Sequence, residues 1–191
     1  VKSKLKGIFF ISYKTVFEIP GMAISVKGFI VSIAICFYPH WIIKRSTTGK
    51  VISMGLWKMC EGIELKQCTE YENTPPYLHH ARALVVIAII FGVFGILLAI
   101  AGQFKSGPEE RQNRKMTVAS GVAFLIAGIC VMLSVWWIDK NIKDNSNNPT
   151  QLPESEKMVK GFGIYFASTT AGLLFVGGIT LCHSFCQKTG N

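Results

Sequence analysis

The sequence contains little charge and few acidic residues, and this scarcity argues against a soluble domain. Only 16% of its 191 residues are charged, whereas half are hydrophobic, and the mean hydropathy is +0.37. This balance is typical of a membrane protein. Lys and Arg outnumber Asp and Glu by 20 to 11. The basic residues stand in polar connectors and are not interleaved with aromatics, so we expect anionic lipid headgroups, and no nucleic acid, as neighbours.

The sequence also lacks a recognisable catalytic or metal-binding pattern. Six cysteines are too few for a disulfide scaffold. Four of them lie within or at the end of apolar runs: Cys36, Cys130, Cys182 and Cys186. A membrane thiol enzyme would need a closely spaced reactive pair, but Cys182 and Cys186 have the wrong spacing, and Cys60 and Cys68 have no nearby base. Apart from Lys27, no apolar run carries a charge of the kind that marks a transport path. We therefore predict no enzyme, no cofactor, no metal site and no pump.

Long apolar runs are what the chain does contain. They cover residues 21–38, 83–102, 116–138 and 161–185. Each approaches the roughly 20 apolar residues that cross about 30 Å of hydrocarbon as a helix, although Lys27 weakens the first. We predict a mainly α-helical membrane protein with four spans, forming a single domain over residues 1–191. A basic leader, 1–20, and two outer loops, 39–82 and 139–160, complete it.

The orientation of these spans follows from the basic residues and the cysteines. Lys and Arg are densest in the leader and in the short connector 103–115, which the positive-inside rule places in the cytoplasm. Two cysteines in the first loop would stay oxidised outside the cell but reduced in the cytosol. Both termini are therefore predicted to be cytoplasmic. The chain begins with Val1 and no initiator Met, which is typical of a fragment or of a gene model with a misplaced first exon.

The first loop holds most of the readable polar chemistry, from Trp41 to Cys68. A polar turn at residues 46–50 precedes a roughly alternating stretch, 51–59, which predicts two short antiparallel strands. A further turn at residues 61–62 would bring Cys60 and Cys68 opposite each other, where a bond is geometrically reasonable. Such a short disulfide would stabilise the loop by about 2–3 kcal/mol. A free redox pair or a metal pair are the alternatives, although neither has ligand-spaced His or Cys nearby.

Two tryptophans of this loop call for different interpretations. Trp41 directly follows a span and, taken alone, fits an interfacial aromatic belt, as Trp136 and Trp137 do at the end of the third span. Trp57 lies far from either neighbouring span, in a polar loop where a large indole needs a surface to pack on. We predict that Trp57 anchors the loop to the membrane surface.

Taken together, these residues resemble those of the claudins, the four-span proteins of tight junctions. The resemblance covers about residues 20–186. Its motifs are Trp41, Gly55-Leu56-Trp57, Cys60, Cys68, Ala81-Arg82-Ala83-Leu84, Gly161-Phe162-Gly163-Ile164-Tyr165 and the run from Gly177-Gly178 to Cys182. A Trp, a Gly-Leu-Trp and two Cys rarely coincide in one loop of a four-span protein of this size.

The resemblance implies a fold and a set of structural residues. The fold is a left-handed four-helix transmembrane bundle with a small extracellular antiparallel sheet, four strands from the first loop and one from the second. Cys60 and Cys68 would form the loop disulfide of the family. Trp41 and Gly55-Leu56-Trp57 would anchor the sheet to the membrane, and Arg82 would be the basic residue at the head of the second span.

The resemblance also implies a structural molecule of cell adhesion at the tight junction of the plasma membrane. Claudins associate side by side and across opposing cells, homo- or heteromerically, and form a paracellular barrier or an ion-selective pore. Residues after the second loop cysteine line that pore, which here points to Glu70, Tyr71 and Glu72. Two carboxylates in a passage narrower than the roughly 8 Å Debye length would attract cations. Lys58 and Lys66 are close in sequence and could cancel them.

Three further expectations concern the ends of the chain and the alternative function. Cys182 and Cys186 are candidates for palmitoylation, with inert thiols as the alternative. The tail, 188–191, lacks a hydrophobic terminus, so PDZ scaffold binding is not predicted from this C-terminus. The alternative is a non-junctional relative, such as the myelin and epithelial membrane proteins or the calcium-channel γ subunits, acting as a membrane-protein regulator. The first loop has no N-glycosylation sequon, because Asn73-Thr74-Pro75 fails the pattern, and this favours the claudins.

Overall fold

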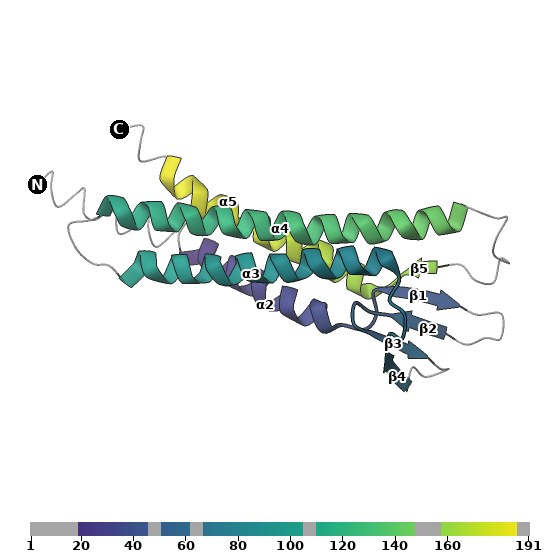
Figure 1. The fold of residues 1–191 in the computed structure, drawn as a ribbon. Coiled ribbons are helices and arrows are strands. Elements are labelled where there is room, and N and C mark those ends of the chain that lie inside the picture. Colours follow the sequence, from purple (N-terminus) through teal and green to yellow (C-terminus); the bar gives the residue numbers. More distant parts are fainter. Residues whose placement is uncertain (1–18, 46–50, 62–66, 105–109, 148–157, 187–191) are drawn as a thin grey trace, which may run out of the picture. The chain divides into compact units, whose positions relative to one another are not determined.

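The computed structural model describes residues 19–45, 51–61, 67–104, 110–147 and 158–186. Four long helices dominate this part of the chain (Figure 1): α2 (Ile19–Phe37), α3 (Pro76–Phe104), α4 (Glu110–Asn147) and α5 (Phe162–Cys186). Each is long and apolar enough to cross a membrane. The prediction of four spans is therefore confirmed.

Two helices extend into the segments that we expected to be loops. Helix α3 begins at Pro76 and not near residue 83, and proline suits the first turn of a helix because its missing N–H has no partner there anyway. Helix α4 continues past residue 138 to Asn147. A helix needs no apolar sequence outside the bilayer, and the ion pair between Lys143 and Asp139, four residues apart at 2.9 Å, supports this extension.

Five short strands form one antiparallel sheet in the order β4-β3-β2-β1-β5. They are β1 (Ile42–Arg45), β2 (Val51–Met54), β3 (Lys58–Glu61), β4 (Gln67–Glu70) and β5 (Met158–Lys160). Strands β1 to β4 come from the first loop, and β5 comes from the second and pairs with β1 (Figure 1). This confirms the sheet that the resemblance implied. The hand of the helix bundle stays a prediction.

The chain divides into two compact units. The first comprises residues 1–30, 88–129 and 170–191, and the second comprises residues 31–87 and 130–169. Each helix contributes to both, whereas all five strands belong to the second.

The first unit is packed through small residues. A Cβ atom placed on Gly178 of α5 would lie 2.9 Å from the carbonyl oxygen of Gly121 in α4, so neither position has room for a larger side chain. Ser120 of α4 donates a hydrogen bond of 2.7 Å to the carbonyl of Gly95 in α3. Close approach and interhelical hydrogen bonds are how helices associate in lipid. In this unit, small residues therefore let the helices pack closely.

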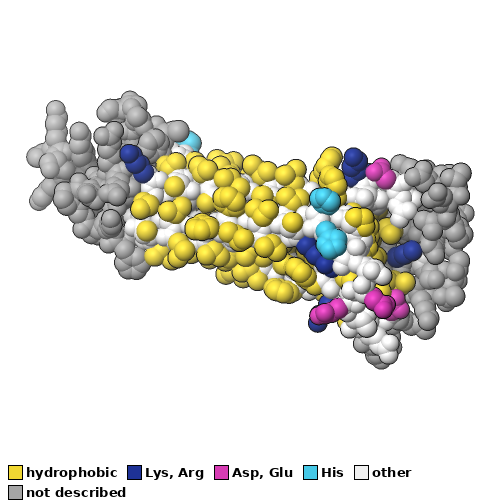
Figure 2. Space-filling view, in the orientation of Figure 1, with side chains coloured by type: hydrophobic (Ala, Val, Ile, Leu, Met, Phe, Trp, Pro, Cys, Tyr) yellow, Lys and Arg dark blue, Asp and Glu magenta, His cyan; other side chains and the backbone are white. Residues whose placement is uncertain are grey.

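The second unit has a core between the sheet and the adjoining helix segments. Its fully buried large side chains are Trp41, Ile42, Leu56, Leu78, Val85, Val131 and Ile138. On the face shown in Figure 2, hydrophobic side chains cover the helices, and the acidic side chains gather over the strands and the helix ends next to them. The polar chemistry of the described residues is therefore concentrated in this unit.

Candidate functional site

Trp41 lies at the centre of the second unit, in the connection from α2 to β1. Its side chain has no exposed surface, and its indole Nε1 donates a hydrogen bond of 3.0 Å to the carbonyl of Ile35 near the end of α2. Its backbone N–H donates to Met54 of β2 at 3.0 Å. The interpretation of Trp41 as a belt residue is therefore wrong, because the indole finds its partner inside the protein. Trp136, which is 54% exposed, still fits a belt.

The turn between β2 and β3 consists of Gly55, Leu56 and Trp57. The Gly55 N–H donates to the carbonyl of Lys58 at 2.9 Å. A Cβ atom on Gly55 would lie 2.6 Å from the Cα atom of Pro39, so the backbone approaches too closely for any other residue. Leu56 is fully buried. The Gly-Leu pair thus brings the turn against the end of α2, and Trp57 follows at the surface.

Trp57 and Tyr71 flank the guanidinium group of Arg82, and we call these three residues the arginine clamp. The Arg82 Cζ atom lies 5.0 Å from the Trp57 ring centroid and 5.3 Å from that of Tyr71. Both distances are within the range of cation–π attraction. Trp57 is 38% exposed, and its Nε1 lies 3.3 Å from the Sγ atom of Cys36 in α2. The clamp therefore joins the β2–β3 turn to the ends of two helices.

Hydrogen bonds hold the clamp to the turn. Arg82 donates from Nε to the carbonyl of Leu56 and from its terminal NH1 nitrogen to the Thr74 hydroxyl at 3.1 Å. The Tyr71 hydroxyl donates to the carbonyl of Gly55 at 2.8 Å. Burial raises the pKa of the Tyr71 phenol, and the nearby Tyr77 adds to this, whereas the Arg82 charge opposes it. Two side chains thus fix successive carbonyls of one turn.

The disulfide is present between adjacent strands. Cys60 of β3 and Cys68 of β4 are direct partners in the sheet, with Cα atoms 4.0 Å apart. Cys60 is 1% exposed, so one half of the bond is buried. The prediction of a structural disulfide is confirmed, and the redox and metal-pair alternatives are not supported. The bond attaches β4, whose four residues are all exposed, to the rest of the sheet.

The three pore-lining candidates lie at and just after β4, but they differ in environment. Glu70 and Glu72 are exposed, whereas Tyr71 is half buried and serves the clamp. Lys58 of β3 is the direct cross-strand partner of Glu70. The structure therefore places one of the two expected opposing lysines beside a candidate carboxylate, and Lys66 lies outside the described residues. Pore lining by these residues stays a prediction.

A charge cluster that sequence reasoning missed joins α4 to β5. Lys160 of β5 forms an ion pair with Asp139, which also pairs with Lys143 one turn further along α4. The hydrogen bond with Asp139 raises the pKa of the Lys160 ammonium. An acidic residue directly after an apolar run was the signal available in the sequence, but its partner in another segment was not.

The two palmitoylation candidates, Cys182 and Cys186, lie at the end of α5. Cys182 is half buried, with its Sγ atom 3.9 Å from the Val118 carbonyl, and the side chain of Cys186 lies outside the described part. Palmitoylation of Cys182 and Cys186 stays a prediction. The leader up to residue 18 and the tail from residue 187 also lie outside that part. Among the residues that the structure describes, no three His, Cys, Asp or Glu side chains gather as metal ligands would.

Known proteins share this sequence pattern over most of its length. The model of the PMP-22/EMP/MP20/Claudin family matches residues 15–181. The chain is 33% identical to claudin-4 of Bos taurus over 179 residues, which is 87% of this chain and 85% of that protein. It is 32% identical to claudin-3 of Homo sapiens over 87% of this chain and 81% of that protein. It is 31% identical to claudin-4 of Homo sapiens over 90% of this chain and 88% of that protein.

Proposed function

This chain belongs to the PMP-22/EMP/MP20/Claudin family, and from that membership we propose that it is a claudin-type structural protein of tight junctions. Its four spanning helices make it a multi-pass membrane protein. In the proposed role it associates side by side with other claudins in one cell and meets claudins of the opposing cell. The resulting strands form a paracellular barrier or an ion-selective pore. Its partners are claudins and membrane lipids, and its role is not catalytic.

The observation that carries the proposal is the sheet, which several contacts join to the helix ends of the second unit. Trp41 and the arginine clamp connect it to α2 and α3, and the Cys60–Cys68 bond connects β3 to β4. A surface that recognises another copy of itself benefits from such preorganisation, because less entropy is lost on association. A sheet of five short strands cannot bury a large hydrophobic core of its own, so these contacts hold it in place instead.

The edge strand β4 supplies the chemistry for ion selection. Every residue of β4 is exposed, and Glu70 ends the strand with Glu72 two residues beyond. Carboxylates lining a narrow aqueous passage favour cations, and Lys58 beside Glu70 opposes that preference. We propose that Glu70 and Glu72 set the ion preference and that Lys58 moderates it.

The test of junctional assembly is expression in fibroblasts that lack tight junctions, followed by freeze-fracture of cell contacts. We expect enrichment at contacts and continuous intramembrane strands. The matched control is the Trp41→Ala variant, which should lose the strands because the sheet loses its central support. Diffuse surface staining without strands, both alone and with a co-expressed strand-forming claudin, would overturn the proposal. That result would instead support the regulator function of the non-junctional relatives.

A further inference from the structure

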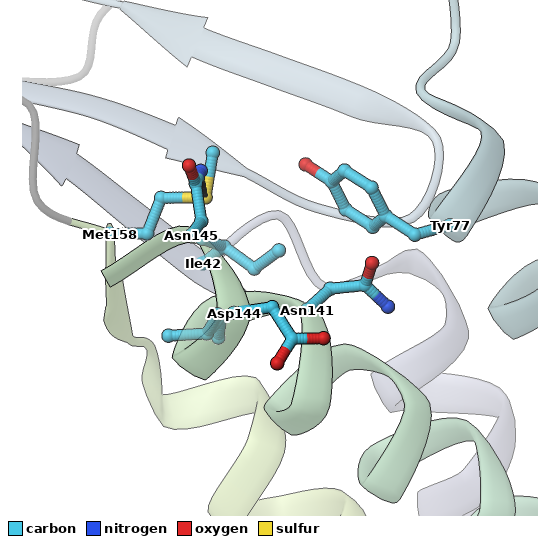
Figure 3. A pocket seen from close by; sticks show the side chains of 7 residues that line it. Ile42, Tyr77, Asn141, Asp144, Asn145 and Met158 are labelled. Carbon is cyan, nitrogen blue, oxygen red and sulfur yellow. Dashed lines mark hydrogen bonds between the residues drawn. The ribbon is translucent and has the colours of Figure 1, made fainter. Parts of the chain in front are cut away.

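A cavity of about 270 Å³ lies in the second unit between the sheet and the outer parts of α3 and α4 (Figure 3). It is lined by Ile42, Tyr77, Asn141, Ile142, Asp144, Asn145 and Met158. Neither Trp41 nor the arginine clamp lines this cavity. Its volume falls below the roughly 300–1,000 Å³ of pockets for drug-sized ligands, so it suits a small molecule or a single side chain.

Each of the two asparagines of this cavity donates one N–H of its side-chain amide to a partner inside the protein. Asn141 donates from Nδ2 to the carbonyl of Trp137 at 2.7 Å. Asn145 donates from Nδ2 to the Sδ atom of Met158 at 3.2 Å, and the two side chains lie together in Figure 3. Each amide also presents its oxygen, which only accepts hydrogen bonds, beside one further N–H donor. Asp144 adds a carboxylate, which only accepts hydrogen bonds when ionised. The cavity thus offers several acceptors and, from Tyr77, one hydroxyl.

The local electrostatics favour a positive ligand. The last four carbonyls of α4, which include those of Asp144 and Asn145, have no partner within the helix and carry partial negative charge. Within the described part of the chain, Asp144 makes no ion pair. The neighbouring lysines of the helix are engaged away from it, because Lys143 pairs with Asp139 and Lys140 lies 5.6 Å from the ring centroid of Trp136.

Two cations of the sheet stand close by. Lys160 of β5 is the direct cross-strand partner of Ile42, but it forms an ion pair with Asp139. Lys44 of β1 is the direct cross-strand partner of Met158, so both are on the same face of the sheet. Its charge opposes a positive ligand in the cavity. Removing the Lys44 charge should therefore strengthen binding of a positive ligand, whereas removing the Asp144 charge should weaken it.

The remaining wall is apolar and suits an alkyl chain. Ile42 is 1% exposed and Ile142 is 5% exposed, and Met158 adds a flexible thioether. A ligand that fits would carry several N–H donors and one positive charge at the end of a short hydrocarbon stem. An ammonium group has three donors, and the cavity supplies acceptors for them.

We propose that this cavity binds an alkylammonium group, supplied either by a small free amine or by a lysine side chain of another protein. Asp144 provides the charge, Asn141 and Asn145 provide amide oxygens, and Ile42 and Ile142 contact the stem. This inference goes beyond junctional assembly and does not depend on it.

The experiment measures binding of n-butylammonium to the full chain in detergent micelles, by the concentration-dependent rise of its melting temperature. We expect saturable stabilisation that neutral n-butanol and anionic butyrate do not reproduce. Because Asp144 is exposed, the Asp144→Asn variant should bind about two- to fivefold more weakly, as expected for losing an ion pair with a solvent-exposed carboxylate. Lys44→Met should bind more tightly. Glu61→Gln, an exposed carboxylate of β3, is the matched control and should bind like the unmodified chain.

A second probe separates the two sources of the ammonium group. Nα-acetyl-lysine methylamide carries the same group on a peptide backbone, so its binding would assign a lysine side chain, and binding of n-butylammonium alone would assign a small amine. The Asn145→Leu variant, which replaces an acceptor with an alkyl group, should weaken either ligand. Binding of neither probe, or equal binding by the unmodified chain and Asp144→Asn, would overturn the proposal.

Discussion

Replacing Arg82 with methionine should loosen the turn formed by Gly55, Leu56 and Trp57. Methionine keeps an unbranched, flexible stem, although a shorter one, and removes the charge and all five donors. The turn then loses the hydrogen bond to the Leu56 carbonyl and the attraction between the guanidinium and the two rings of the clamp. The Leu56 carbonyl would also be left without this partner.

The size of this effect follows from the contacts. A hydrogen bond from a charged group contributes about 1.5–3 kcal/mol, and a cation–π contact at a partly exposed site contributes about 0.5–1 kcal/mol. Taking the lower values, because the clamp is partly exposed, the turn should lose about 2.5 kcal/mol of local stability. At about 1.4 kcal/mol per factor of ten, this corresponds to a roughly sixtyfold larger equilibrium constant for local opening.

The assay is amide hydrogen exchange of the segment 51–61 in detergent micelles, because exchange measures local opening directly. The Gly55 amide, which donates to Lys58, should show the change most clearly. Arg82→Lys should give an intermediate result, since one ammonium cannot reproduce the planar fork. Arg45→Met, at the exposed end of β1, is the matched control and should leave exchange unchanged. Protection in folded Arg82→Met that equals the unmodified protein would refute the clamp.

Three further predictions concern stability. Replacing both Cys60 and Cys68 with alanine should cost about 2.5 kcal/mol, from the entropy of closing a loop of eight residues. Reductant should lower the melting temperature of the unmodified chain and leave that of the double variant unchanged, whereas an effect on the variant would contradict a single structural bond. Gly178→Ala should destabilise by roughly 1–3 kcal/mol through overpacking, whereas Gly172→Ala, where no atom lies within 4 Å of the added Cβ, should not; equal melting temperatures would count against the packing described. Burial raises the pKa of Tyr71 above its ordinary value of 10.0. The stability that the protonated phenol contributes to the fold is therefore complete below pH 10.0 and is lost as the pH rises further. An absorbance titration should show one fewer tyrosine ionising at unusually high pH in Tyr71→Phe than in the unmodified chain. An equal number in both would argue against the burial of this phenol.

The helices were the most predictable part of the fold, because an apolar run of sufficient length has few alternatives in a bilayer. Their ends were less predictable. Pro76 and Asn147 lie in polar sequence, where helix formation depends on local capping, ion pairs and tertiary contacts and not on hydropathy. The pairing of Cys60 with Cys68 was within reach, because a short turn places them on neighbouring strands.

The contacts that hold the sheet could not be derived from local patterns. Trp41 has the sequence context of a belt residue, and only the position of the Ile35 carbonyl makes it a buried donor. Arg82 and Trp57 are separated by the whole of β3 and β4, so their stacking depends on the sheet order. The resemblance to the claudins singled out Trp41, Trp57 and Arg82, but the hydrogen bond of Trp41 and the stacking of Arg82 are seen only in the structure.

The central proposal is that this protein forms part of a paracellular barrier or ion-selective pore, and dilution potentials across epithelial monolayers test it most directly. Monolayers expressing the unmodified chain should change their relative permeability to Na⁺ and Cl⁻. Exchanging Glu70 and Glu72 for glutamine should lower the preference for Na⁺, and Lys58→Met should raise it. Identical permeabilities with and without the protein, although it is present at the cell contacts, would contradict the account.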